Sequence, residues 1–324
     1  MTLRQTSRIL IALLAAGLLV YLLHRVGFDT IGQAFGRLGW QGALVILAMG
    51  LLENAFNALA LVRAVGGRVG FFNALCYNGA GAIINSVIPW ESGEIVKGTL
   101  LRRHLSGQDA VCGTVVWNYL LKLSTPVAGL TASVIALVVG HELAPALAWA
   151  VVGLSVLSFL PYLGLRYLLN KGVAGGVIGF LRRVRLIRKD PAELQRWATE
   201  LDGKLKEFHR DHPRDWLAMF LFQIGARTTV LAGWFVSSRL LGYEYEFGTC
   251  ALVFSGFSIA SYVLMVIPAK IGVNEGTGYA LFAAYGLDGG AGLITTVVGH
   301  LRVILTNGVA ALFAFAGSSR KSVF

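Results

Sequence analysis

The chain has 324 residues, of which 56% are hydrophobic and 14% are charged, and its formal net charge at pH 7 is +11. A soluble globular domain is about 45–50% apolar and about 25% charged, so this composition excludes an ordinary soluble protein. The apolar residues form continuous runs, such as Ile9–Leu23 and Val127–Gly140, instead of alternating with polar ones. This pattern excludes a β-barrel and indicates an all-α polytopic membrane protein.

About six apolar stretches are long enough to be full membrane spans. They are predicted at residues 8–24, 41–63, 110–139, 144–169, 213–241 and 290–317. The first run follows a short basic start without a convincing cleavage site, so we expect an uncleaved helix. The stretch 25–40 is expected to be an external connection. The three cysteines lie in apolar runs and form no CxxC pair, so we predict buried free thiols and no metal or redox site.

Two further apolar stretches, 73–105 and 248–286, are interrupted at Pro89 and Pro268 and then continue with charged residues. Charged side chains in the middle of a bilayer are energetically costly, so these second parts are not expected to face lipid. Each stretch is predicted to be a re-entrant hairpin with a half-helix in, a polar turn and a half-helix out. Aligning Pro89 with Pro268 also aligns Gly93 with Gly272, which indicates an internal repeat.

The distribution of basic residues predicts which side each loop faces. The loops 64–72 and 102–109 and the long segment 170–212 are basic, so the positive-inside rule places them, with both termini, in the cytoplasm. The chain is therefore expected in the cytoplasmic (inner) membrane. The first hairpin then enters from the cytoplasm and the second from outside. Such an inverted repeat is found in many secondary transporters.

We therefore predict three parts: a first transmembrane half, 1–169, a cytoplasmic segment, 170–212, and a second transmembrane half, 213–324. The middle segment combines apolar residues at helical spacing with basic ones, which favours amphipathic helices lying on an anionic lipid surface. A cytoplasmic linker is the alternative. Because this membrane topology explains the excess positive charge, nucleic-acid binding is not predicted.

Polar residues at the two breaks and inside the spans are the candidates for a substrate site. A helix that starts inside the membrane presents unpaired N–H groups and partial positive charge, which suit a lipid phosphate. Lysines and arginines would add charge for that phosphate, and the acids would hold an amine or hydroxyl. The alternative is that the acids cap helices and pair with lysines, and that asparagines join neighbouring helices. The candidates are Glu53, Asn85, Pro89, Glu91, Glu94, Lys97, Lys122, Arg227, Lys270, Asn274, Glu275 and Arg302.

The two break motifs also resemble a known family. An apolar run from Asn85 ends in Pro-x-x-x-Gly-Glu at Pro89–Glu94, Pro-x-x-x-Gly-Val-x-Glu-Gly runs from Pro268 to Gly276, and Arg302 lies in the last span. This order resembles the lysylphosphatidylglycerol synthase transmembrane region, a broad family of flippase-like integral membrane proteins. The resemblance covers nearly the whole chain.

Members of that family with a cytoplasmic aminoacyltransferase domain make and translocate aminoacylated phosphatidylglycerol. This chain ends at Phe324 without such a domain, so the resemblance implies the translocating half alone. Family members often carry an arginine a few residues after the first Gly-Glu, where this chain has Lys97 and then Arg102-Arg103. That departure leaves the headgroup open.

The sequence thus predicts a flippase that moves the headgroup of a membrane lipid through a polar cavity while the acyl chains stay in the bilayer. One alternative is a membrane-embedded enzyme on a lipid-linked substrate, with Glu94 or Glu275 as base, and another is a small-solute or ion transporter. The longest polar segment, 170–212, is too short for a catalytic domain. Because P-loop, HExxH and GxSxG motifs are absent from the sequence, neither an enzyme nor a cofactor is predicted. The sequence does not indicate an oligomeric state.

Overall fold

The structure is a computed structural model that describes residues 24, 28–87, 92–141, 143–171, 191–263 and 272–319. In these residues all the regular structure is α-helical. The predicted all-α class is therefore confirmed for the described part of the chain.

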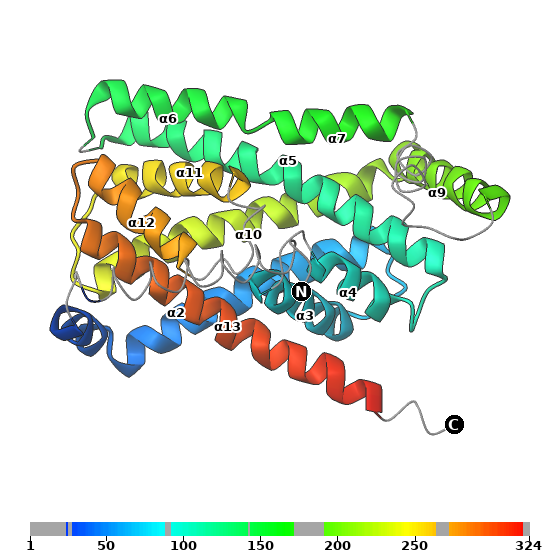
Figure 1. Ribbon diagram of the computed structural model, residues 1–324, viewed down its shortest axis with the longest axis horizontal. Coiled ribbons are helices and arrows are strands. Elements are labelled where there is room, and N and C mark those ends of the chain that lie inside the picture. Colours follow the sequence, from blue (N-terminus) through cyan, green and yellow to red (C-terminus); the bar gives the residue numbers. More distant parts are fainter. Residues whose placement is uncertain are drawn as a thin grey trace, which may run out of the picture.

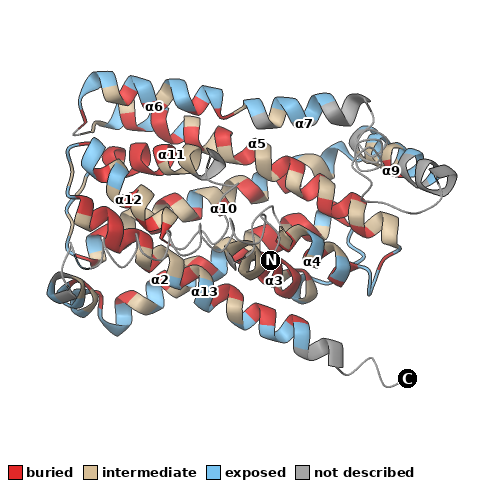
Figure 2. Cartoon of the chain, viewed as in Figure 1, coloured by how far each residue is buried: buried red, intermediate tan, exposed pale blue. Residues whose placement is uncertain are grey.

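Among the described residues, five helices are long and apolar enough to cross a membrane. Large apolar side chains on them point outward, with exposed fractions of 82% for Val138, 71% for Leu312 and 63% for Trp149. Figure 2 shows buried residues where helices face each other and exposed ones along the outer sides of α6 and α7. An apolar exterior of this kind belongs to a multi-pass membrane protein. The five helical stretches are Ile31–Ala64, Gly107–Val139, Pro145–Gly164, Pro213–Leu240 and Gly289–Phe315.

These stretches correspond to five of the predicted spans, and the predicted span 8–24 lies outside the described residues. The long helices run side by side along the long axis of the molecule (Figure 1). They are α2 (Phe28–Ala64), α5 (Gly107–Val139), α10 (Pro213–Leu240) and α13 (Gly289–Ser319).

Two spans differ from their predicted form. The stretch predicted as an external connection, 25–40, contains the start of α2, whose first part ends at Gly39 with φ 57°, a value that favours glycine. The predicted span 144–169 is divided into α6 (Pro145–Leu157) and α7 (Leu160–Lys171), which lie end to end in Figure 1. Pro161 explains this division, because proline lacks an N–H donor and disfavours helical backbone before it.

In each of the stretches 73–105 and 248–286, one helix precedes the break and a second helix follows it. The first contains α3 (Phe71–Val87) and α4 (Ser92–Leu101), and the second α11 (Phe247–Val263) and α12 (Val273–Ala284). The break residues 88–91 and 264–271 lie outside the described residues. In Figure 1 the loop after α4 lies at the right end and the loop after α12 at the left end. The order long helix, 17-residue helix, short helix, long helix therefore occurs twice.

Helices of the first part of the chain pack against helices of the second part. Helix α2 lies along α10, α3 packs on α13, and α11 packs on α5. Glycines allow these close approaches: a Cβ at Gly79 of α3 would lie 2.5 Å from the Ala310 Cβ of α13. Helix α12 meets α13 where Gly278 faces Gly292, with a Cβ at Gly278 only 2.8 Å from the Gly292 carbonyl oxygen.

Helix α9 (Pro191–Asp211) is the described part of the predicted amphipathic segment. Its apolar residues Leu201, Leu205 and Phe208 pack on the core that includes α5. At the same end of α5, Asp109 accepts hydrogen bonds from Arg68 at 2.7 Å and from Lys204 of α9. Apolar packing and ion pairs together fix α9 to the bundle, and residues 172–190 lie outside the described part of the chain.

Candidate functional site

Between the helices lies a cavity of about 440 Å³ with a mostly polar and aromatic wall. Helices from both parts of the chain contribute to it, including α2, α3, α4 and α5 and also α10, α11, α12 and α13. Eight of the predicted site residues line this one cavity: Glu53, Asn85, Glu94, Lys97, Lys122, Arg227, Asn274 and Arg302. Pro89, Glu91 and Lys270 lie outside the described residues, and Glu275 is buried close to the wall.

The first turn of α4 carries a buried ion pair. The Lys97 Nζ donates to both carboxylate oxygens of Glu94, at 3.1 and 3.2 Å. The same ammonium group lies 3.2 Å from the centre of the Trp117 ring, in a cation–π contact. The Lys97 side chain is only 2% exposed and that of Glu94 is 14% exposed, so Lys97 is a buried cation neutralised mainly by Glu94.

The start of α4 is held directly against α3. The Asn85 side-chain oxygen accepts a hydrogen bond of 2.7 Å from the Gly93 N–H. At this contact a Cβ added to Gly93 would lie 1.9 Å from the Gly81 carbonyl oxygen, so only glycine fits. One N–H that the sequence analysis assigned to a lipid phosphate is therefore already occupied by Asn85.

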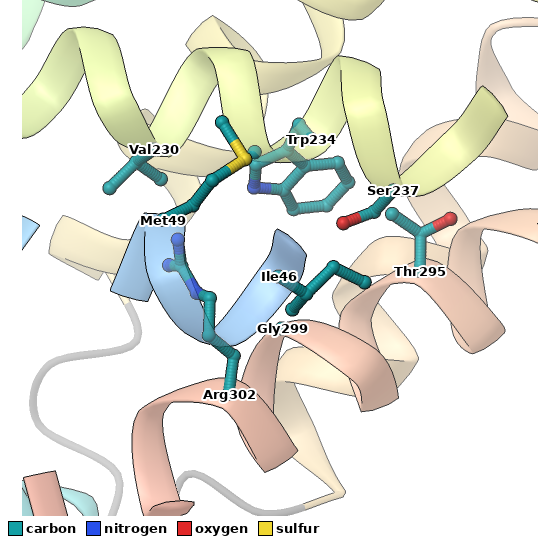
Figure 3. A pocket seen from close by; sticks show the side chains of 9 residues that line it. Ile46, Met49, Val230, Trp234, Ser237, Thr295, Gly299 and Arg302 are labelled. Carbon is teal, nitrogen blue, oxygen red and sulfur yellow. The ribbon is translucent and has the colours of Figure 1, made fainter. Parts of the chain in front are cut away.

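A second ion pair joins α2 to α13. The Arg302 guanidinium donates to Glu53 at 2.9 Å, and the side chains are 10% and 20% exposed, respectively. Figure 3 shows Arg302 reaching from α13 toward Met49 on α2 and Val230 on α10. Gly50 makes room for the arginine stem, because a Cβ there would lie 2.8 Å from the Arg302 Cγ. Beside it lies a small cavity of about 20 Å³, which has room for about one water.

The start of α12 contains a third linked set. Glu275 accepts the Gly272 N–H at 2.6 Å and thereby caps the helix. Its other carboxylate oxygen contacts the Nδ1 of His300 on α13. The Nε2 of that ring lies 3.1 Å from the Asn274 amide nitrogen. Asn274 and His300 line the cavity, so Glu275 is linked to the cavity through His300.

Two more cations line the cavity from the long helices, Lys122 on α5 and Arg227 on α10. Lys122 and Asn118 are one helical turn apart and therefore share a face of α5, and both line the cavity. The Arg227 Nε is buried and has no hydrogen-bond acceptor among the described residues.

Amide side chains make up much of the remaining wall. Asn78 of α3 donates to Asn54 of α2 at 2.7 Å, and the Trp117 indole N–H donates to the Asn57 carbonyl oxygen at 3.1 Å. The bond between Asn78 and Asn54 is the helix-joining role that the sequence analysis kept as its alternative for asparagines, whereas Trp117 bonds to the backbone of Asn57. The Asn57 side-chain oxygen is buried without a donor among the described residues.

The site also contains residues outside the candidate list. Trp117 was not selected, although it directly precedes the candidate face of Asn118 and Lys122. His300 has an evident signal, a titratable side chain in an apolar span, but its link to Glu275 depends on how α12 and α13 pack. Among the described residues no cluster of acids, histidines and cysteines could hold a metal ion.

The arrangement is a cavity between helices whose wall combines charged and hydrogen-bonding side chains, and charged side chains of this kind are costly inside a membrane. The family model described as the lysylphosphatidylglycerol synthase transmembrane region matches residues 8–310 of this chain. No curated protein matches the chain.

Proposed function

Because the chain belongs to the lysylphosphatidylglycerol synthase transmembrane region family, we propose that it is a translocase that carries a lipid headgroup across the cytoplasmic membrane. The headgroup occupies the polar cavity while the acyl chains remain in the bilayer. A volume of about 440 Å³ accommodates a small headgroup, since ligand sites range over about 300–1,000 Å³.

The observation that carries this proposal is the gathering of charged residues from distant parts of the sequence on one cavity wall. Glu53, Glu94, Lys97, Lys122, Arg227 and Arg302 all line it. Charged side chains within a membrane protein are costly and mark substrate or ion pathways. Their concentration around one chamber supports transport of a polar group.

In the membrane, we propose that α3–α4 and α11–α12 are re-entrant hairpins that enter from opposite leaflets as halves of an inverted repeat. The repeated order of helices and the opposite ends at which the loops after α4 and α12 lie support this placement. The test replaces Cys76, Cys112 and Cys250 and introduces either Ser106→Cys or Asp288→Cys. A membrane-impermeant thiol reagent on oriented vesicles should label the two positions from opposite sides. Labelling of both from one side would exclude the inverted arrangement.

Transport is tested in vesicles that contain the purified protein and phosphatidylglycerol with a fluorophore on its acyl chain. Membrane-impermeant dithionite destroys the fluorophore only in the outer leaflet, so translocation increases the fraction that is lost. The wild type should increase this fraction, and Arg302→Gln should abolish the increase. Leu312→Ala, at a 71% exposed lipid-facing position, is the matched control and should transport normally.

Because Arg302→Gln leaves Glu53 without its partner, the double variant Glu53→Gln/Arg302→Gln accompanies it. This pair of amides can hydrogen-bond without a buried charge, so loss of transport in a folded double variant is a loss of function. The rival readings give different results in the same vesicles. Chemical change of the lipid would favour the membrane-embedded enzyme, and uptake of a soluble ion without lipid movement would favour the solute transporter.

A further inference from the structure

The charges of the cavity restrict the kind of headgroup that it accepts. Three carboxylates belong to the site, and each already contacts a basic group of the chain. Glu53 pairs with Arg302, Glu94 with Lys97 and Glu275 with His300. The sequence analysis assigned these acids to an amine or a hydroxyl on the substrate. In the structure, an amine would have to displace a basic side chain from each of them.

The cations exceed the acids. Four Lys and Arg side chains line the cavity, against three carboxylates, so the site carries a net charge of +1 with neutral His300 and +2 with protonated His300. A surplus cation inside a membrane protein is unfavourable until an anion neutralises it.

Arg227 accounts for the surplus positive charge of the cavity. Its Nε is buried with no acceptor among the described residues, whereas Arg302 and Lys97 have carboxylate partners at 2.9 and 3.1 Å. A guanidinium is suited to bidentate hydrogen bonding with phosphate oxygens. Lys122 lines the same cavity from α5 and supplies a second positive charge.

We infer that the transported headgroup is a net anionic phosphate ester that bears hydroxyls and no amine, with its phosphate at Arg227 and Lys122. This inference rests on the proposed function and specifies its substrate class. The amide-rich wall suits hydroxyls, because the buried side-chain oxygen of Asn57 has no donor among the described residues. An aminoacylated, cationic headgroup does not fit this balance of charge.

The experiment compares three acyl-labelled lipids that differ only in headgroup: phosphatidylglycerol, phosphatidylethanolamine and lysyl-phosphatidylglycerol. All three lipids carry the phosphate, but the ammonium groups of the other two would add positive charge to a site that already has a surplus. Phosphatidylglycerol should therefore move about tenfold faster than the other two, which corresponds to about 1.4 kcal/mol. Arg227→Gln should remove this preference. Arg239→Gln is the matched control, because Arg239 lies on the same helix but is exposed and bonds to a backbone oxygen of the 242–246 loop. This variant should retain the preference for phosphatidylglycerol. Equal rates for all three lipids, or faster movement of the lysyl lipid, would overturn the inference.

A binding measurement separates this inference from translocation itself. In detergent, phosphatidylglycerol should raise the melting temperature of the wild type but not of Arg227→Gln, and phosphatidylethanolamine should raise neither. Without lipid, Arg227→Gln should melt no lower than the wild type, because it removes a cation whose buried Nε has no acceptor among the described residues. Lower melting would assign Arg227 a structural role and overturn the inference. Selective stabilisation without transport would refute the translocase and retain the anionic site.

The lipid is also distinguished from a soluble phosphate ester. Excess sn-glycerol 3-phosphate should neither slow phosphatidylglycerol movement nor accumulate in the vesicles. Its accumulation in the absence of lipid movement would assign the anionic site to a solute transporter and overturn the lipid assignment.

Discussion

Lys97→Met tests how much the buried ion pair of Glu94 and Lys97 in α4 contributes to the free energy of unfolding. The substitution leaves Glu94 without its cation and removes the ammonium group from the face of Trp117. Breaking a buried pair by removing one partner costs about 3–5 kcal/mol. We expect a loss near 3 kcal/mol, because Glu94 borders the cavity and is 14% exposed. At about 2 °C per kcal/mol, the melting temperature should fall by about 6 °C.

The double variant Lys97→Met/Glu94→Leu removes both charges and should return to within about 1 kcal/mol of the wild type, since an apolar pair replaces a buried ion pair at little cost. The three cysteines are buried, so a thiol-reactive fluorophore reports unfolding in detergent. Lys204→Met, in a pair whose lysine is 36% exposed, is the control and should change stability by less than about 1 kcal/mol. Additive losses in the double variant would refute the reasoning.

Three further outcomes are expected with the same thiol assay. Gly93→Ala should lower the melting temperature, because its Cβ would lie 1.9 Å from the Gly81 carbonyl oxygen. Gly153→Ala is the control and should not lower it, because no atom lies within 4 Å of the added Cβ. Equal melting temperatures would show that α3 and α4 can move apart without cost. Trp117→Phe keeps a ring beneath Lys97 but loses the bond to Asn57, so it should cost about 1 kcal/mol, and Trp117→Leu should cost about 1 kcal/mol more; the reverse order would contradict the cation–π contact. Asp109→Asn loses two partly exposed ion pairs and should cost about 1–2 kcal/mol at low salt, since exposed pairs contribute up to about 1 kcal/mol each. The loss should shrink at high salt, and a loss that does not depend on salt would contradict this explanation.

The fold could be predicted from the sequence where the signal is local. Continuous apolar runs located five spans, and the two proline breaks located the helix pairs α3–α4 and α11–α12. Two local details were not predicted. Gly39 interrupts α2 after an unexpected helical start, and Pro161 divides a run that is apolar enough for one span.

The sequence predicted which residues belong to the candidate site, but it did not predict which of them pair with each other. Polar residues in apolar stretches are costly, and eight of them do line one cavity. Which acid meets which base depends on packing between helices far apart in sequence. The bond of Arg302 to Glu53 joins residues on α13 and α2, and the contact of Lys97 with Trp117 joins α4 to α5. Only the pair Glu94–Lys97, three residues apart on one helix, follows from spacing alone.

The packing of helices from the first part of the chain against helices from the second part has a consequence for biosynthesis. Helix α3 ends at Val87 and rests on α13, which begins at Gly289. About 200 residues must be synthesised between them, which takes about 10–40 s at ribosomal speed. During that time the face of α3 at Gly79 lacks its partner helix α13, so this face of the nascent first half must be covered by the insertion machinery or by lipid until the final helix is made.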